Sequence, residues 1–178
     1  MSPGSHGAAT RHRKHLRVLL PFTRDSLRIP DELAREIGSE DALIIVPQGR
    51  GVVQRVEVGR DGDGAFLGRG WPEFAGACGV GAGWFVVLRH HGGGVLTVKA
   101  FDATHCLREL GTPPGAMGST ESSRRPQFIG LLPADPMEKM IIPAKIVQNY
   151  IPRGQQNNHI AVLFGPLGKM CEIEVNMN

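Results

Sequence analysis

Short runs of apolar residues, separated by glycine, proline and charged residues, repeat along most of the chain. The clearest of them is Val52–Val58, which alternates so that one face carries Val52, Gln54, Val56 and Val58. A period of two predicts a β-strand with one buried face, because successive side chains of a strand point to opposite sides. The same criteria predict further strands at Leu16–Leu20, Ala42–Val46, Phe66–Leu67, Trp84–Leu88 and Val95–Phe101.

Two short helices interrupt the predicted strands. Asp31–Ile37 follows a proline, carries acidic residues in its first turn, where the helix dipole favours them, and ends at Gly38. Trp71–Cys78 has a proline near its first turn, a position that helices tolerate. Many short strands with two small helices predict a mainly β fold, either a barrel or a sandwich. The expected aromatic core anchors are Trp71, Phe74, Trp84, Phe85 and Phe101.

The chain begins one order of elements twice. Ile29–Pro30 opens a helix-like stretch, a strand-like stretch and the alternating run, and Ile142–Pro143 opens the same order, which ends in Cys171–Val175. We therefore expect one whole domain and the front half of a second, which is either poorly ordered or leans on the first. The expected segments are a disordered basic arm at 1–15, the first domain at 16–110, a linker at 111–126 and a truncated second domain at 127–178.

Charge is distributed unevenly along the chain. Its 178 residues have a net charge of +3, but the first thirty positions hold six basic residues and one acid, Asp25. A basic front end indicates a polyanionic partner or a solvated tail, and Arg11–Arg17 fits a nuclear import signal as well as a solvated arm. Three well-separated cysteines indicate a reducing compartment. No apolar run approaches the roughly 20 residues of a membrane helix, so we expect a soluble intracellular protein.

Patterns for catalysis and for metal or cofactor binding are incomplete. Gly79–Gly83 lacks dinucleotide-binding spacing, and Asp61–Gly64 lacks the later ligands of a calcium loop. The paired spacing of a zinc site is missing among the candidate ligands His90, His91, His105 and Cys106. Asp102 has no nucleophile motif nearby and is expected to cap a turn. The sequence thus predicts no enzyme, no cofactor, and neither catalytic nor metal-binding residues.

Five segments form an ordered set along the first domain. They are Phe22–Pro30, Val52–Val58, Phe66–Phe74, Gly83–Leu88 and Val95–Asp102. Each segment is weak alone, but the ordered set resembles the plant B-three (B3) DNA-binding domain family. The resemblance extends over roughly residues 16–110 and looks nearest to the reproductive-meristem branch, whose members often carry several copies. Residues 126–178 resemble the front half of a second copy.

The resemblance implies a seven-stranded open pseudobarrel with two short helices, which grips the major groove of double-stranded DNA with two arms. The first arm lies between the first strand and the first helix, and the second is the hairpin Gly59–Ala65. Arginine forks suit phosphates and guanine edges, and hydroxyl groups donate to phosphate oxygens. The DNA-binding residues implied in this way are Thr23, Arg24, Asp25, Ser26, Arg28, Arg55, Arg60 and Arg69.

Three positions depart from the family pattern. Gln54 stands where the family usually has a tryptophan, and Trp84 where it has a turn acid. The second arm, often basic in the family, carries Asp61 and Asp63, and carboxylates near phosphates oppose counterion release. Two hypotheses stay open. One is a plant transcription regulator that binds specific DNA sequences in the nucleus; the other is a degenerate module that has lost DNA binding and binds a protein partner through its partial second copy.

Overall fold

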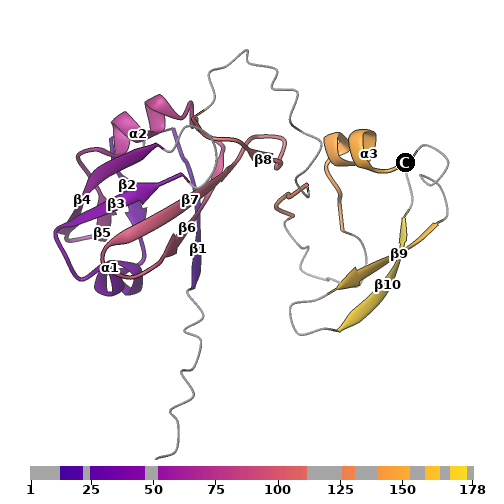
Figure 1. Ribbon diagram of the computed structural model, residues 1–178, viewed down its shortest axis with the longest axis horizontal. Helices are drawn as coiled ribbons and strands as arrows, with labels where there is room; N and C mark the ends of the chain where they lie inside the picture. The colour runs from indigo at the N-terminus through magenta and orange to yellow at the C-terminus, as the bar shows by residue number, and fades with distance from the viewer. Residues whose placement is uncertain are drawn as a thin grey trace, which may run out of the picture.

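The computed structural model describes residues 13–21, 25–46, 52–111, 126–130, 140–152, 159–164 and 169–175. Its architecture is mainly β, as the sequence predicts, with short helices between the strands (Figure 1). The elements up to residue 108 are β1 Lys14–Val18, β2 Leu27–Ile29, α1 Asp31–Ile37, β3 Asp41–Ile45, β4 Val53–Asp61, β5 Gly64–Leu67, α2 Trp71–Ala77, β6 Phe85–His90, β7 Val95–Phe101 and β8 Leu107–Arg108.

One curled sheet forms the barrel. Its strands lie in the order β1-β6-β7-β3-β4-β5-β2, and β8 pairs with the end of β7 beyond β3. Neighbouring strands are antiparallel except for β3 and β7, which are parallel. β1 and β2 stand at the two ends of this order, and no backbone ladder joins them in the part of the chain described. A side chain bridges this open seam instead, because Arg17 Nε donates to the carbonyl oxygen of Arg28 at 2.9 Å.

The strands β2 to β7 pack apolar side chains into a common core, whereas Leu16 and Val18 of β1 are exposed. In β7, Leu96, Val98 and Ala100 are buried while Lys99 between them is exposed, as alternation requires. The predicted aromatic anchors take part to different extents. Trp71 and Phe74 of α2 are at most 1% exposed, with ring centroids 5.6 Å apart, and Trp84 packs partly buried against the same core. The remaining two, Phe85 and Phe101, are also buried.

The two helices close opposite ends of the barrel (Figure 1). α1 buries Leu33, Ala34 and Ile37, and Gly38 ends it in the left-handed conformation, with φ of 67° and its N–H on the Ala34 carbonyl oxygen. Its bounds are those predicted from the sequence. α2 starts directly after Gly70 and is one residue shorter than predicted. Local start and stop signals were therefore sufficient for both helices.

Some predicted loops are shorter in the structure. The sequence predicts a flexible tip at Gly59–Gly64, but β4 continues to Asp61 and β5 starts at Gly64, so that only Gly62 and Asp63 turn the chain. Similarly, β6 extends through Arg89 and His90, two residues beyond the predicted strand Trp84–Leu88, and β1 starts at Lys14, inside the segment expected as a disordered arm. In each case pairing with a neighbouring strand overrides a weak local preference for strand.

Beyond the barrel, the described residues form α3 Ala144–Tyr150 and the antiparallel strands β9 His159–Phe164 and β10 Met170–Val175. α3 follows Pro143 as α1 follows Pro30, and an antiparallel pair of strands comes after each helix. Residues 127–129 pair with the barrel, since the Leu107 N–H donates to the Gln127 carbonyl oxygen at 2.9 Å. Residues 1–12 and 112–125 lie outside the described residues, and the predicted domain boundaries stay predictions.

Gly70 is a position where the barrel tolerates no side chain. Its φ is 93°, and a Cβ there would lie 2.1 Å from the carbonyl oxygen of Arg55. We expect Gly70→Ala to lower the free energy of unfolding by at least about 2 kcal/mol, because left-handed strain and the clash add. Gly76→Ala in α2 is the matched control, since a Cβ there meets nothing within 4 Å. Urea unfolding should find the control neutral or more stable by up to about 1 kcal/mol; equal stability of Gly70→Ala and wild type would refute the constraint.

Candidate nucleic-acid interface

The first arm, residues 23–28, belongs to the connection between the two strands that border the open seam. Thr23 and Arg24, predicted to bind DNA, lie outside the described residues. Asp25 is exposed and Ser26 is half-buried. Arg28 is the middle residue of β2, where its two buried neighbours point into the core and its own side chain is partly exposed. The pairing of β2 with β5 and the burial of Leu27 and Ile29 in the core thus fix the C-terminal end of this arm.

The second arm, residues 59–65, is an extension of β4 and β5 and not a flexible loop. Its last cross-strand pair joins Asp61 to Gly64. The backbone N–H of Asp63 donates to Asp61 Oδ1 at 2.9 Å, which orders the turn. Because β5 pairs with β2, the second arm lies beside the strand that carries Arg28. The fold therefore brings the base of the first arm and the acidic hairpin together.

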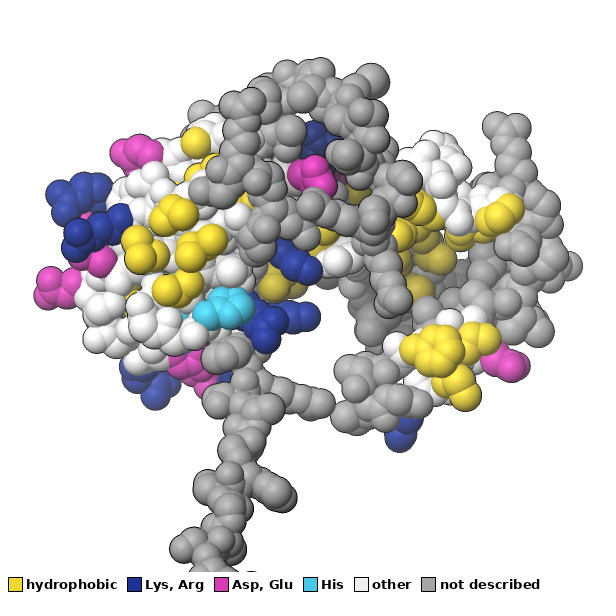
Figure 2. Space-filling view, viewed as in Figure 1, with side chains coloured by type: hydrophobic (Ala, Val, Ile, Leu, Met, Phe, Trp, Pro, Cys, Tyr) yellow, Lys and Arg dark blue, Asp and Glu magenta, His cyan; other side chains and the backbone are white. Residues whose placement is uncertain are grey.

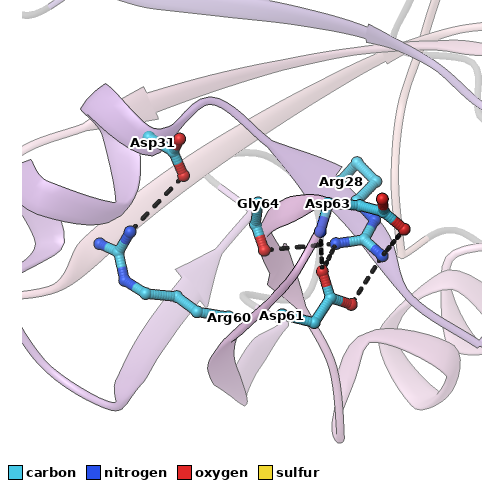
Figure 3. Close-up of polar contacts among 6 residues, drawn as sticks. All are labelled: Arg28, Asp31, Arg60, Asp61, Asp63 and Gly64. Carbon is cyan, nitrogen blue, oxygen red and sulfur yellow. Dashed lines mark hydrogen bonds and ion pairs between the residues drawn. The ribbon is translucent and has the colours of Figure 1, made fainter.

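Arg28 and Asp61 connect the two arms through a pair of parallel hydrogen bonds (Figure 3). Nη1 donates to Oδ1 at 2.5 Å, and Nη2 donates to Oδ2 at 2.7 Å. Nη1 also donates to the Gly64 carbonyl oxygen at 3.3 Å, and Nη2 lies 3.8 Å from Asp63 Oδ2. Fork-to-carboxylate geometry is the strong form of an arginine–aspartate contact. A predicted DNA-binding arginine is therefore held by the carboxylate of the opposite arm.

Arg60 lies on the other side of the same hairpin. Successive residues of a strand face opposite ways, so Arg60 points away from the Arg28–Asp61 contact and toward α1 (Figure 3). Its Nη1 lies 3.5 Å from Asp31 Oδ1, at the first residue of that helix. The second arm thus presents one arginine and two carboxylates on two different faces.

Arg55 of β4 and Arg69, in the connection between β5 and α2, lie at a shallow groove that Asp41 and Glu57 also line. Asp41 of β3 is directly opposite Glu57 of β4, and like charges in such a pair destabilise a sheet. Two arginines compensate them. Arg55 pairs with Asp41, and Arg69 Nε lies 3.7 Å from Glu57 Oε2. Gly70 makes the second contact possible, because the backbone approaches so closely there that the Glu57 N–H donates to the Arg69 carbonyl oxygen at 2.8 Å.

Opposite charges are interleaved over this whole surface. Figure 2 shows basic and acidic side chains side by side along the edge of the barrel formed by β4 and β5. Each of the four predicted arginines that the structure describes pairs with at least one carboxylate, and their partners are Asp31, Asp41, Glu57, Asp61 and Asp63. The described interface is thus nearly neutral. A phosphate that contacts one of these arginines must compete with a carboxylate already in place.

Ionisation of these groups follows from the contacts. The hydrogen bond from Arg28 lowers the pKa of Asp61 from its usual value, against a smaller opposing effect of desolvation. The bond from Arg55 lowers the pKa of Asp41 in the same way. The same two bonds raise the pKa of both arginines. All four groups are consequently charged at neutral pH, and the contacts are ion pairs.

The carboxylate partners on β3 and α1 and the aromatic residue beneath Arg28 were not predicted from the sequence. The guanidinium carbon of Arg28 lies 5.3 Å from the ring centroid of Phe66, its opposite residue on β5. A signal was present for Asp41, since a hairpin made from the two predicted strands would place it near Glu57. No local pattern points to Phe66, because its contact depends on the pairing of strands that are distant in sequence.

Residues outside the arms have structural contacts. Asp102 caps its turn as predicted, accepting the Thr104 N–H at 2.9 Å. His90 is buried with Nδ1 3.9 Å from Glu36 Oε2, and His105 meets the Phe85 ring edge-on. Among the described residues, no three histidine, cysteine or acidic side chains are grouped so that they could hold a metal ion. Within the same residues, every helix is too short or too polar to cross a membrane. That the chain is not an enzyme stays a prediction.

The barrel and its paired arms define the class of the protein. It is an open, mainly β pseudobarrel in which β2, the strand that ends the first arm, pairs with β5 of the second arm. Residues 19–104 match the B3 DNA binding domain, and this part of the chain belongs to that family. The family resemblance seen in the sequence is thereby confirmed.

Relatives come from rice. Two B3 domain-containing proteins of Oryza sativa subsp. japonica are 45% identical to the chain over 201 and 192 residues. The alignments cover 97% and 98% of this chain but 46% and 44% of the relatives, so the chain spans less than half of their length. The solved structure of a hypothetical protein from Arabidopsis thaliana has a TM-score of 0.42 and 16% identity, covering 53% of this chain and 94% of that chain.

Acid is expected to remove the contribution of the Arg28–Asp61 pair. Because the pKa of Asp61 is lowered on folding, the pair stabilises the fold above the unfolded value of about 4 and loses its effect as the pH falls through the lower folded-state pKa. Arg28→Met should therefore be less stable than wild type at pH 7, and the difference should shrink below about pH 4. NMR titration should show the pKa of Asp61 rising in Arg28→Met but not in the control Arg89→Met on β6. An unchanged Asp61 titration in Arg28→Met would contradict the pairing.

Proposed function

We propose that the chain binds specific sequences of double-stranded DNA in the plant nucleus as a transcription regulator, with both arms in the major groove. The observation that carries the proposal is the membership of residues 19–104 in the B3 DNA binding domain family. The pairing of the strands supports it. β2 and β5 are paired, so the strand that ends the first arm and the hairpin of the second arm lie side by side at one end of the sheet order.

Affinity and specificity have different sources in this proposal. Arg24 and the basic run Arg11–Arg17 supply phosphate contacts, which are sequence-independent and salt-dependent. Thr23 and Ser26 donate to phosphate oxygens, and the arms reach the base edges. Arg55, Arg60 and Arg69 add to binding only as far as phosphates displace their carboxylates. The same basic run serves as the nuclear import signal.

We further propose that residues 127–178 are the front part of a second B3-like copy, as in the reproductive-meristem branch. The order of α3, β9 and β10 after Pro143 supports this, because it repeats the order of α1, β3 and β4 after Pro30. The whole length of the rice relatives is about twice that of this chain, so activities of a longer protein lie outside this proposal.

A second candidate function is assembly with a protein partner, without DNA binding. Two observations favour it. The described arginines of the interface are neutralised by carboxylates, and the hairpin β9–β10 exposes Val162, Phe164 and Met170, of which Phe164 and Met170 are opposite each other. Exposed apolar clusters of this kind are typical of interaction sites. DNA binding decides between the two functions.

Fluorescence anisotropy with random duplex DNA tests the proposal. We expect binding whose logarithmic affinity falls linearly with the logarithm of salt concentration, with a slope of about −0.9 for each phosphate contacted. Arg24→Gln should weaken binding severalfold at about 50 mM salt and reduce the size of the slope by about 0.9, because one phosphate contact is lost.

Arg108→Gln is the matched control, since it removes one positive charge from β8, which pairs with β7 and not with the strands of either arm or of the basic run. It should change the slope much less than Arg24→Gln does. If wild type fails to bind random duplex at low salt and also fails to select a sequence from a random pool, DNA binding is excluded and the assembly function is favoured.

A further inference from the structure

The guanidinium group of Arg28 packs over the ring of Phe66, at a position where β2, β5 and β4 lie side by side. On β5, Phe66 is opposite Arg28 of β2 on one side and opposite Gly59 of β4 on the other. Gly59 leaves the space that the ring occupies, because a Cβ there would lie 2.3 Å from Phe66 Cζ. The guanidinium carbon lies 5.3 Å from the ring centroid, within the range of a cation–π contact. The position of Arg28 is therefore fixed from below by packing as well as at its end by hydrogen bonds.

Three hydrogen bonds and one longer ion pair occupy both terminal nitrogens of this arginine. A guanidinium has five N–H groups, two on each terminal nitrogen and one on Nε. Nη1 donates to Asp61 and to the Gly64 carbonyl oxygen, and Nη2 donates to Asp61 and faces Asp63. Recognition of guanine needs two donors aimed at O6 and N7. Asp61 occupies Nη1 and Nη2, so Arg28 cannot present this end of its fork to O6 and N7 while the contact holds.

We propose that Arg28 is a positioning residue, which holds the second arm against β2 and neutralises Asp61, and that it acts on DNA through this arm without contacting DNA itself. This inference rests on the proposed DNA-binding function and replaces the direct contact that the sequence suggests for Arg28. Its physical basis is the acidity of the arm. Without Arg28, the carboxylates of Asp61 and Asp63 would face phosphates with their negative charge uncompensated. The turn would also be less ordered, because Gly62 and Gly64 beside them are flexible.

A double-mutant cycle in the full chain separates positioning from contact. The variants are Arg28→Met, Asp61→Asn and both together, each titrated with duplex DNA over a range of salt. For a positioning residue, Arg28→Met should weaken binding about tenfold when Asp61 is present but less than about twofold in the Asp61→Asn background, where no carboxylate is left to neutralise at that position. The salt slope of the double variant should equal that of wild type.

A direct phosphate contact gives the opposite pattern. Arg28→Met would then weaken binding at least as much in the Asp61→Asn background, where the arginine is free, and would reduce the size of the salt slope by about 0.9 in both backgrounds. Either of these results overturns the proposal. Circular dichroism and urea unfolding of each variant ensure that only folded protein is compared.

Hydrogen exchange without DNA tests the same residue independently. Arg28→Met should raise the exchange rates of backbone amides in residues 59–65 at least severalfold, whereas Arg89→Met should leave them unchanged. Unchanged exchange in Arg28→Met overturns the positioning role even if DNA binds. Raised exchange in a chain that binds no DNA supports the structural part of the inference, while the missing DNA binding excludes the proposed function on separate grounds.

Discussion

Burial of one apolar face of the strands β2 to β7 in a single core is the constraint on which the barrel depends. Each of these strands contributes inward-facing residues, and α1 and α2 cover the ends of the core that would otherwise meet water. A closed ring would satisfy all backbone groups, but the ring is open between β1 and β2, and Arg17 bridges it through one side-chain hydrogen bond. The first arm begins at this opening. The least closed part of the barrel thus borders the surface proposed to bind DNA.

Local sequence patterns correctly predicted those helices and strands whose first and last residues carry start and stop signals. α1 was found at both ends because Pro30, the acids after it and Gly38 act within one turn of the chain. β7 was also found at both ends, since its alternation is bounded by Gly94 and Asp102. The second arm was predicted as a hairpin, but its tip was expected to be longer than the two residues that turn the chain. Glycine and aspartate have low strand propensity, and the ladder between β4 and β5 continues through them only because tertiary pairing supports it.

The pairing of charges depends on contacts that no local pattern encodes. Arg28 and Asp61 are 33 positions apart and meet because β5 pairs with both β2 and β4 in one register. A shift of one residue would turn either side chain to the opposite face. Residue type and position along the chain were enough to select the arginines as candidates. Residue type and position could not show that each of the four described candidate arginines is paired with a carboxylate. This pairing decides whether a phosphate can bind these arginines without displacing another group.

Paired carboxylates alter the balance between affinity and specificity in a DNA-binding surface. Phosphate contacts favour any duplex equally, whereas base-edge contacts differ between sequences. Each of the four candidate arginines that the structure describes must lose a carboxylate when it gains a phosphate, so the electrostatic gain of these residues on non-specific DNA is small. Hydrogen bonds to base edges depend on short-range geometry and are weakened less. Neutralised arms therefore reduce absolute affinity more than they reduce the ratio of specific to non-specific binding, and this ratio decides occupancy among the many competing sites of a genome.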